Sequence, residues 1–166
     1  MAMLDTLADV PGNPLDTLEE IVRGRDWTFE RFGEAEMLVS CSGRWSDYAL
    51  HFTWSDELCA VHLACAVETR FPDVRRPAIH ELLTMVNGYL WLGHFDLGGD
   101  RATPVFRHAV PLRGTRGATA GQLEDLVEIA IDECERFYPA FQYVAWAGKA
   151  PGEAIDASMI ETAGEA

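Results

Sequence analysis

Several features that mark other protein classes are missing from this chain of 166 residues. No hydrophobic run approaches the roughly 18 to 20 residues that a membrane-spanning helix needs. The acidic stretch 1–9 lacks the basic region that opens a signal peptide. From these two absences we expect a cytoplasmic protein that does not enter a membrane. Lysine is also almost absent, because Lys149 is the single lysine among 13 basic residues.

Positive charge is also scarce. The chain has 27 acidic and 13 basic residues, which gives a net charge of −14. Such a field repels nucleic acids and anionic membranes and favours basic partners. The exception is segment 98–119, where four arginines face a single acid, Asp100. These arginines either balance the acidic helices of the same fold, which we favour, or form an anion site.

Complete catalytic signatures are missing as well. His80 and Glu81 begin an H-E-x-x-H pattern, but Thr84 stands where the second histidine would be. The chain has no G-x-S-x-G nucleophile motif and no glycine loop with the spacing of a phosphate-binding site. We therefore expect no catalytic residues and no cofactor.

The four cysteines lie within apolar patterns, as expected of buried, reduced thiols. Cys59, His62 and Cys65 resemble a ligand set on paper. On a strand, however, His62 would point away from both cysteines, and their spacing is not that of a C-x-x-C pair. We therefore interpret the cysteines as structural: Cys41, Cys59, Cys65 and Cys134.

The first half of the chain predicts one helix followed by a meander. Asn13 is a good N-cap and Pro14 a good first helical residue, and apolar residues then recur at helical spacing up to Gly24. From Trp27 the hydrophobic period changes to two, and short polar connections separate the alternating segments. The expected strands are Trp27–Phe32, Glu36–Ser42, Trp45–Trp54 and Leu58–Glu68.

The second half predicts a helix, a hairpin and a long helix. Pro77 opens the first helix, and Gly93 ends it or shapes the joint that follows. The hairpin strands are His94–Leu97 and Val105–Val110, and the prolines that flank the second strand, Pro104 and Pro111, favour an edge position for it.

A capping box at residues 119–122 begins the long helix. Pro139 should kink or divide this helix, because proline lacks the N–H and its ring clashes with the preceding turn. From Pro151 a short acidic helix follows.

This order contains no βαβ alternation and so predicts an α+β fold: an antiparallel sheet, formed by a meander plus a second hairpin, packed by three main helices. We divide the chain into a loose leader (1–12), one domain (13–150) and an acidic helical tail (151–166).

Residues 90–97, Leu-Trp-Leu-Gly-His-Phe-Asp-Leu, form the most informative segment. Buried indole and imidazole groups need polar partners, so such a segment is either a tightly specified joint or a functional surface. We expect the joint and a neighbouring arginine to form a structural joint or to shape a partner-binding groove or dimer contact: Trp91, His94, Phe95, Asp96 and Arg107. Four tryptophans are expected to be core or interface anchors: Trp45, Trp54, Trp91 and Trp146.

A metal site is the alternative for the same segment. His94 and Asp96 share a strand face, and a hairpin could bring His108 alongside, which imitates a two-histidine, one-carboxylate triad. We favour hydrogen-bonding roles that lock the joint, because no further acid or base group accompanies the three residues.

Four stretches carry a resemblance to a known family: Asn13–Asp16, Leu90–Asp96, Phe106–His108 and Glu133–Gln142. With the strand meander, they resemble the bacterial YbjN-domain family in its alphaproteobacterial form, over residues 13–163. The resemblance implies a sensory-transduction or stress regulator. It also implies a fold similar to that of type III secretion chaperones, which are small, acidic, dimeric α+β proteins that hold partner polypeptide segments. No catalytic residues come with this resemblance.

Two functions follow as expectations. The first is a non-enzymatic, chaperone-like or regulatory adaptor, a cytoplasmic homodimer that binds a protein or peptide client through a sheet edge and nearby apolar pockets. The second is a metal-dependent enzyme or metal sensor that uses His94, Asp96 and His108. A weaker third is a small-ligand sensor with a tryptophan-lined pocket.

Overall fold

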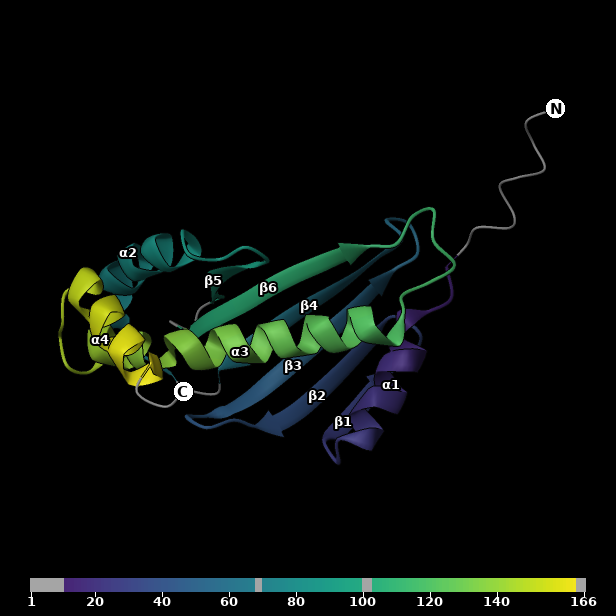
Figure 1. Ribbon diagram of the computed structural model, residues 1–166, viewed down its shortest axis with the longest axis horizontal. Helices are drawn as coiled ribbons and strands as arrows, with labels where there is room; N and C mark the ends of the chain where they lie inside the picture. The colour runs from purple at the N-terminus through teal and green to yellow at the C-terminus, as the bar shows by residue number, and fades with distance from the viewer. Residues whose placement is uncertain (1–10, 68–69, 100–102, 164–166) are drawn as a thin grey trace.

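The computed structural model describes residues 11–67, 70–99 and 103–163. A six-stranded antiparallel sheet of order β1-β2-β3-β4-β6-β5 has α1 and α3 across one face, and α2 and α4 pack together at one end (Figure 1). The α+β class, the meander and the second hairpin are therefore confirmed. The first ten residues of the expected leader lie outside the described part of the chain. The strands are β1 (Thr28–Phe32), β2 (Glu36–Ser42), β3 (Asp47–Ser55), β4 (Ala60–Val67), β5 (His94–Gly98) and β6 (Thr103–Pro111); the helices are α1 (Pro14–Gly24), α2 (Arg76–Asn87), α3 (Ala120–Ala145) and α4 (Pro151–Ala163), with a 3-10 turn, η1 (Asp73–Arg75), before α2.

Helix α1 begins where the local sequence predicts. The Asn13 side chain accepts a hydrogen bond from the Leu15 N–H at 3.0 Å, and Pro14 occupies the first turn, where no N–H is needed. Leu15, Leu18 and Val22 are buried against the sheet and α3. A Glu19–Arg23 pair at i,i+4 spacing is also present, although pairs of this kind stabilise a helix only slightly.

The core lies between the helices and one face of the sheet. On β3, Tyr48, Leu50, Phe52 and Trp54 are buried, and the residues between them are half-buried. Strand β4 repeats this pattern, with small residues such as Ala64 on the opposite face. The described helices bury only the first face. We call the second one the open face.

One strand position differs from the prediction: β6 lies between β4 and β5, and β5 is the edge. Both prolines of β6 sit where no ladder hydrogen bond is lost. The Leu112 N–H donates to the Cys59 carbonyl. Because the hydrogen-bonding direction of the main chain alternates along a strand, the nitrogen of Pro111 faces away from β4, toward the side where β5 has ended. The pairing of β6 with β4 ends at Val105, so Pro104, the preceding residue, has no partner on β4.

Several element boundaries also differ, three of them for a clear local reason. β3 starts after Trp45, because a hydrogen bond from the Gly43 N–H to the Ser46 carbonyl closes the preceding turn. β4 starts after Cys59, whose positive φ of 47° belongs to the β3–β4 turn. α2 ends at Asn87, well before Gly93.

Helix α3 carries the predicted capping box, in which the Thr119 hydroxyl accepts from the Gln122 N–H and the Gln122 side chain accepts from the Thr119 N–H. It then runs without division through Pro139, which is buried. The segment from Pro151 is helical, as expected, and packs on α3, with the Ser158 hydroxyl donating to the Arg136 carbonyl. Across the described ranges, no helix combines the length and apolar character needed to cross a membrane.

Candidate docking surface

Phe95 is the part of the predicted joint that belongs to the core. It is 2% exposed, and its ring packs edge-on against Phe106 and Phe141, both at 5.4 Å between centroids, and against Phe137 at 6.2 Å. Edge-to-face aromatic pairs of this kind add about 0.5–1.5 kcal/mol each beyond simple burial. This cluster fixes β5, and with it the α2–β5 joint, against β6 and α3.

The outer edge of β5 is closed by side chains. Asn87, at the end of α2, accepts a hydrogen bond from the Phe95 N–H at 2.7 Å and donates to the Phe95 carbonyl at 3.0 Å. The Asp96 carboxylate accepts from the Leu97 N–H at 2.8 Å. An edge strand normally offers these groups to an incoming strand. The edge of β5 is therefore a poor site for strand addition at Phe95.

Gly93 lets the chain turn tightly into β5. Its φ of 71° lies in the left-handed region that favours glycine. A Cβ at this position would fall on the Phe106 ring and lie 2.7 Å from the Arg107 carbonyl oxygen. The backbone of the joint is thus pressed directly onto β6.

Large apolar side chains of the same joint stay in water. Trp91 is 98% exposed, Tyr89 49% and Leu92 48%. We call these three residues the joint patch. Tyr89 keeps one side against Phe137, at 6.4 Å between ring centroids. Clustered exposed apolar residues on a fixed framework mark binding surfaces far more often than scattered ones do.

The polar residues of the joint lie on the open face. His94 is paired with Arg107 across the β5–β6 ladder, and Arg107 Nε lies 3.7 Å from the Asp96 carboxylate. The same cross-strand row continues through Ala64 to His51 on β3. An exposed ion pair of this kind contributes little to stability. It does place a strip of histidines and one arginine beside the joint patch in an otherwise acidic protein.

His62 also belongs to this strip. Partial burial lowers its pKa, and the neighbouring charges of Arg107, His51, His94 and His108 lower it further. The imidazole is therefore held in its neutral form at neutral pH.

The metal triad of the alternative hypothesis is not assembled. His94 and Asp96 lie on the open face, whereas His108 is paired with the buried Leu63 and so lies on the helix-covered side of β6. Within the described parts of the chain, no group of three or more histidine, cysteine or acidic residues could hold a metal ion. The sequence does not determine the register of the β5–β6 hairpin, and a one-residue change of register reverses the face on which His108 lies relative to His94. For this reason the prediction placed the two histidines together.

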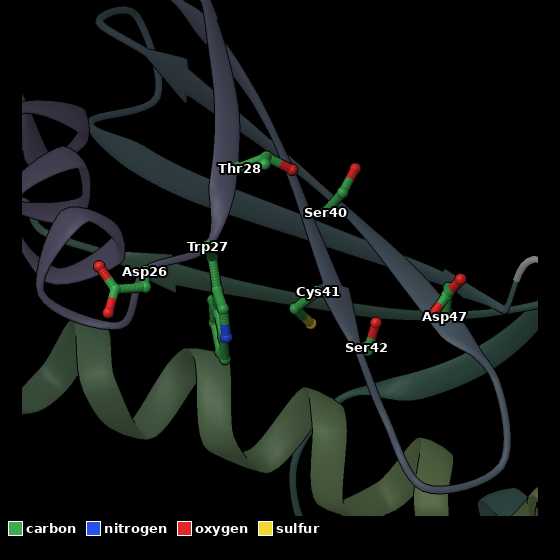
Figure 2. A pocket seen from close by; sticks show the side chains of 7 residues that line it. All are labelled: Asp26, Trp27, Thr28, Ser40, Cys41, Ser42 and Asp47. Carbon is green, nitrogen blue, oxygen red and sulfur yellow. The ribbon is translucent and has the colours of Figure 1, made fainter.

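A cavity that the sequence did not indicate opens at the β1–β2 corner of the sheet. It has a volume of about 450 Å³. Figure 2 shows Trp27 directed toward α3, while the side chains of Ser40 and Asp47 point to the other side of the strands. Its lining residues are Asp26, Trp27, Thr28, Ser40, Cys41, Ser42 and Asp47.

Cys41 is the one thiol among the residues that line this cavity, and it is not activated. Burial raises the pKa of its thiol to about 11, and the nearby charges of Cys65 and Asp47 act in the same direction. A thiol in this state is a poor nucleophile at neutral pH. The cavity therefore offers hydrogen-bonding and acidic groups beside an unreactive thiol.

The tryptophans expected as anchors divide into three environments. Trp54 is buried, with its indole N–H donating to Asp56. Trp45 is 37% exposed beneath the Arg44 guanidinium, and Trp146 is 62% exposed with an edge contact to Phe71. Of the four expected anchors, Trp91 alone is almost fully exposed.

The geometry thus defines a single-sheet α+β protein that presents an aromatic joint and an uncovered sheet face. The chain belongs to the YbjN family: the family profile described as “Putative bacterial sensory transduction regulator” matches residues 14–143. The fold is similar to that of the solved structure titled “Crystal structure of YbjN, a putative transcription regulator from E. coli”. The two share 14% sequence identity at a TM-score of 0.51, over 75% of this chain and 86% of the other. No curated protein matches the chain.

The joint predicts a sharp difference between two glycine substitutions. Gly93→Ala should lower the free energy of unfolding by ~3 kcal/mol or more, because it adds a clash with Phe106 to backbone strain. Gly114→Ala is the matched control, since Gly114 has a φ of 79° with no atom near its added Cβ, and it should lose only about 1 kcal/mol. Urea denaturation measures both values. Equal losses would show that the joint is not held against β6.

The histidine strip predicts a pH dependence of stability. Because the folded pKa of His62 lies below its ordinary value of 6.5, the folded state binds fewer protons than the unfolded state in this range. The contribution of His62 to stability is therefore fully present above pH 6.5 and is lost as the pH falls through the lowered pKa. His62→Gln should flatten the pH dependence of the free energy of unfolding, and His80→Gln, at an exposed position on α2, should leave it unchanged. Parallel curves for wild type and His62→Gln would contradict this assignment.

Proposed function

We propose that the protein is a non-enzymatic, chaperone-like or regulatory adaptor that binds a segment of a partner protein at the joint patch. The 98% exposure of Trp91 is the observation that carries this proposal. Leaving an indole in water gives up several kcal/mol of possible burial. Tryptophan is also the residue type most enriched among those that dominate protein interfaces.

The joint is preformed, which favours binding. Gly93 presses the backbone onto β6, and Asn87 holds the Phe95 main chain, so little backbone freedom remains to be lost when a partner docks. Because the β5 edge is closed at Phe95, the partner segment would dock by side-chain contacts at the joint.

Family membership and charge support the regulatory part of the proposal. The family profile describes a sensory transduction regulator, which agrees with a protein that acts by binding. The net charge of −14 would increase association rates with basic partners. We further propose that the chain is of the alphaproteobacterial form and holds its clients as type III secretion chaperones do. A cytoplasmic location is also part of the proposal, and the four free thiols support it.

Self-association forms a second part of the proposal. Another exposed apolar pair, Val74 at 82% and Trp146 at 62%, lies near the start of α2, whereas the joint patch follows its end. We assign this second pair to a homodimer contact, which leaves the joint patch open to the partner segment.

A photo-crosslinking amino acid in place of Trp91 tests the docking proposal in the native cell. It should give discrete adducts that map to one segment of a partner, whereas the same probe at Ile160, which is 74% exposed on α4, should not. A synthetic peptide of the mapped segment should bind Trp91→Ala about 30-fold more weakly than wild type, because a dominant interface tryptophan contributes about 2 kcal/mol. Unfolding of Trp91→Ala should match wild type, since the side chain has few contacts to lose.

Two results would contradict the docking proposal. One is equal binding of the mapped peptide to wild type and Trp91→Ala. The other is crosslinking from position 91 that is no greater than from position 160.

The dimer is tested by sedimentation velocity at high micromolar concentration. Wild type should sediment as a dimer, Val74→Glu as a monomer, and Ile160→Glu, a matched exposed aliphatic position, as a dimer. A monomeric wild type, or a dimer that Val74→Glu leaves intact, would contradict the assignment.

A further inference from the structure

Strand β2 extends beyond its neighbour at the edge of the sheet. The pairing of β1 with β2 ends at Thr28 and Ser40, whereas β2 continues to Ser42 and stays paired with β3 to Asp47. The chain before β1 leaves the sheet at Asp26, which has a positive φ of 55°. Two residues of β2 therefore have no strand on their outer side within the described chain.

The direction of the Ser42 main chain follows from the hydrogen bonds on either side of it. The Ala35 carbonyl accepts from the Trp54 N–H, and the Gly43 N–H donates to the Ser46 carbonyl. The register between these two points is unbroken, so odd-numbered residues of β2 bond to β3 and even-numbered ones face β1. The N–H and the carbonyl of Ser42 thus face the position that β1 has vacated.

The vacated position is held open by contacts of the departing chain. Arg25 makes an ion pair with Glu128 on α3 at 2.7 Å and stacks over the Trp27 ring at 5.0 Å. These contacts draw residues 25–27 toward α3 and away from β2. The result is the cavity of about 450 Å³ shown in Figure 2.

The lining of this cavity is polar and acidic. Hydroxyl groups come from Thr28, Ser40 and Ser42, and carboxylates from Asp26 and Asp47; no lysine or arginine lines it. Among the described residues, neither Asp26 nor Asp47 takes part in an ion pair: the ion pairs of this region join Arg25 to Glu128, and Arg31 to residues of α1 and of the β1–β2 turn.

We propose that an extended, basic segment of a partner protein adds to the sheet at this point, in line with β1 and antiparallel to β2. Its main chain pairs with the N–H and carbonyl of Ser42, and its basic side chains reach Asp26 and Asp47. Strand addition of this kind takes affinity from main-chain hydrogen bonds and specificity from side chains. The inference rests on the proposed function, that the protein binds partner segments, and it names one edge and one chemistry for them.

A defined peptide tests the inference directly. The probe is the capped hexapeptide Lys-Val-Lys-Val-Lys-Val, and its counterpart with glutamate in place of lysine is the control. Titration of the folded protein followed by amide NMR should shift the Ser42 resonance and slow its hydrogen exchange with the lysine peptide only. The lysine peptide methylated at alternate main-chain nitrogens, on the edge that faces β2, should lose this effect. Equal shifts from the glutamate peptide, or from the methylated one, would overturn the proposal.

Two matched pairs of variants separate charge from main chain. Asp26→Asn with Asp47→Asn should weaken binding about fivefold, since two exposed ion pairs contribute about 1 kcal/mol together. Glu124→Gln with Asp125→Asn makes the same change in net charge on the exposed side of α3 and should change binding less than twofold. Ser42→Ala should bind like wild type, whereas Ser42→Pro, which removes the N–H that faces the cavity, should not bind. Equal effects of the two double variants would overturn the proposal.

Trp91→Ala separates this inference from the proposed function. It should leave binding of the lysine peptide unchanged, because the joint patch lies at the other edge of the sheet. If the peptide fails to bind while Trp91-dependent binding of a mapped partner segment holds, the strand-edge inference is wrong and the docking function stands.

Discussion

The attachment of Phe95 is the constraint on which the rest of the structure depends. Its ring joins β5 to α3 through Phe137 and Phe141, and its main chain is held by the Asn87 side chain at the end of α2. These contacts fix the path between α2 and β5. Because that path is fixed and short, Trp91 cannot fold back into the core and remains in water. One buried aromatic thus determines the position of one exposed aromatic.

The two edges of the sheet differ in a way that matters for binding. At β5, hydrogen bonds with the side chains of Asn87 and Asp96 occupy main-chain groups that an incoming strand would need. At β2, the departure of the chain at Asp26 leaves the main chain of Ser42 facing a polar cavity. The first edge therefore supports recognition by side chains, and the second supports recognition by strand addition. Neither mode needs a bond to be made or broken by the protein.

Much of the fold follows from signals that are local in sequence. The Asn13 cap, the Thr119–Gln122 capping box and the alternation of β3 each depend on neighbouring residues, and the structure contains all three. The position of β6 beside β4 could not be read in this way. Strand order depends on packing between segments far apart in the chain, and Pro111 was misleading because only one side of β6 is covered at that point.

The candidate site was predicted less completely. Alternation correctly separates Phe95 from the residues on either side of it, but the exposure of Trp91 depends on how Gly93 turns the chain, which no periodicity shows. The face of His108 depends on a hairpin register that the sequence leaves open. The cavity at β2 depends on a left-handed conformation at Asp26, a residue type that adopts it only occasionally.

Native-state hydrogen exchange of the Phe95 amide tests the central claim most directly, because this N–H donates its hydrogen bond to the Asn87 side chain, which fixes the joint. If the docking surface is preformed, this amide exchanges in the free protein as slowly as the amides of the central strands, through unfolding of the whole domain. Exchange at the rate of an unstructured peptide would show that the joint is not fixed, and the account of Trp91 as a rigidly presented anchor would be wrong.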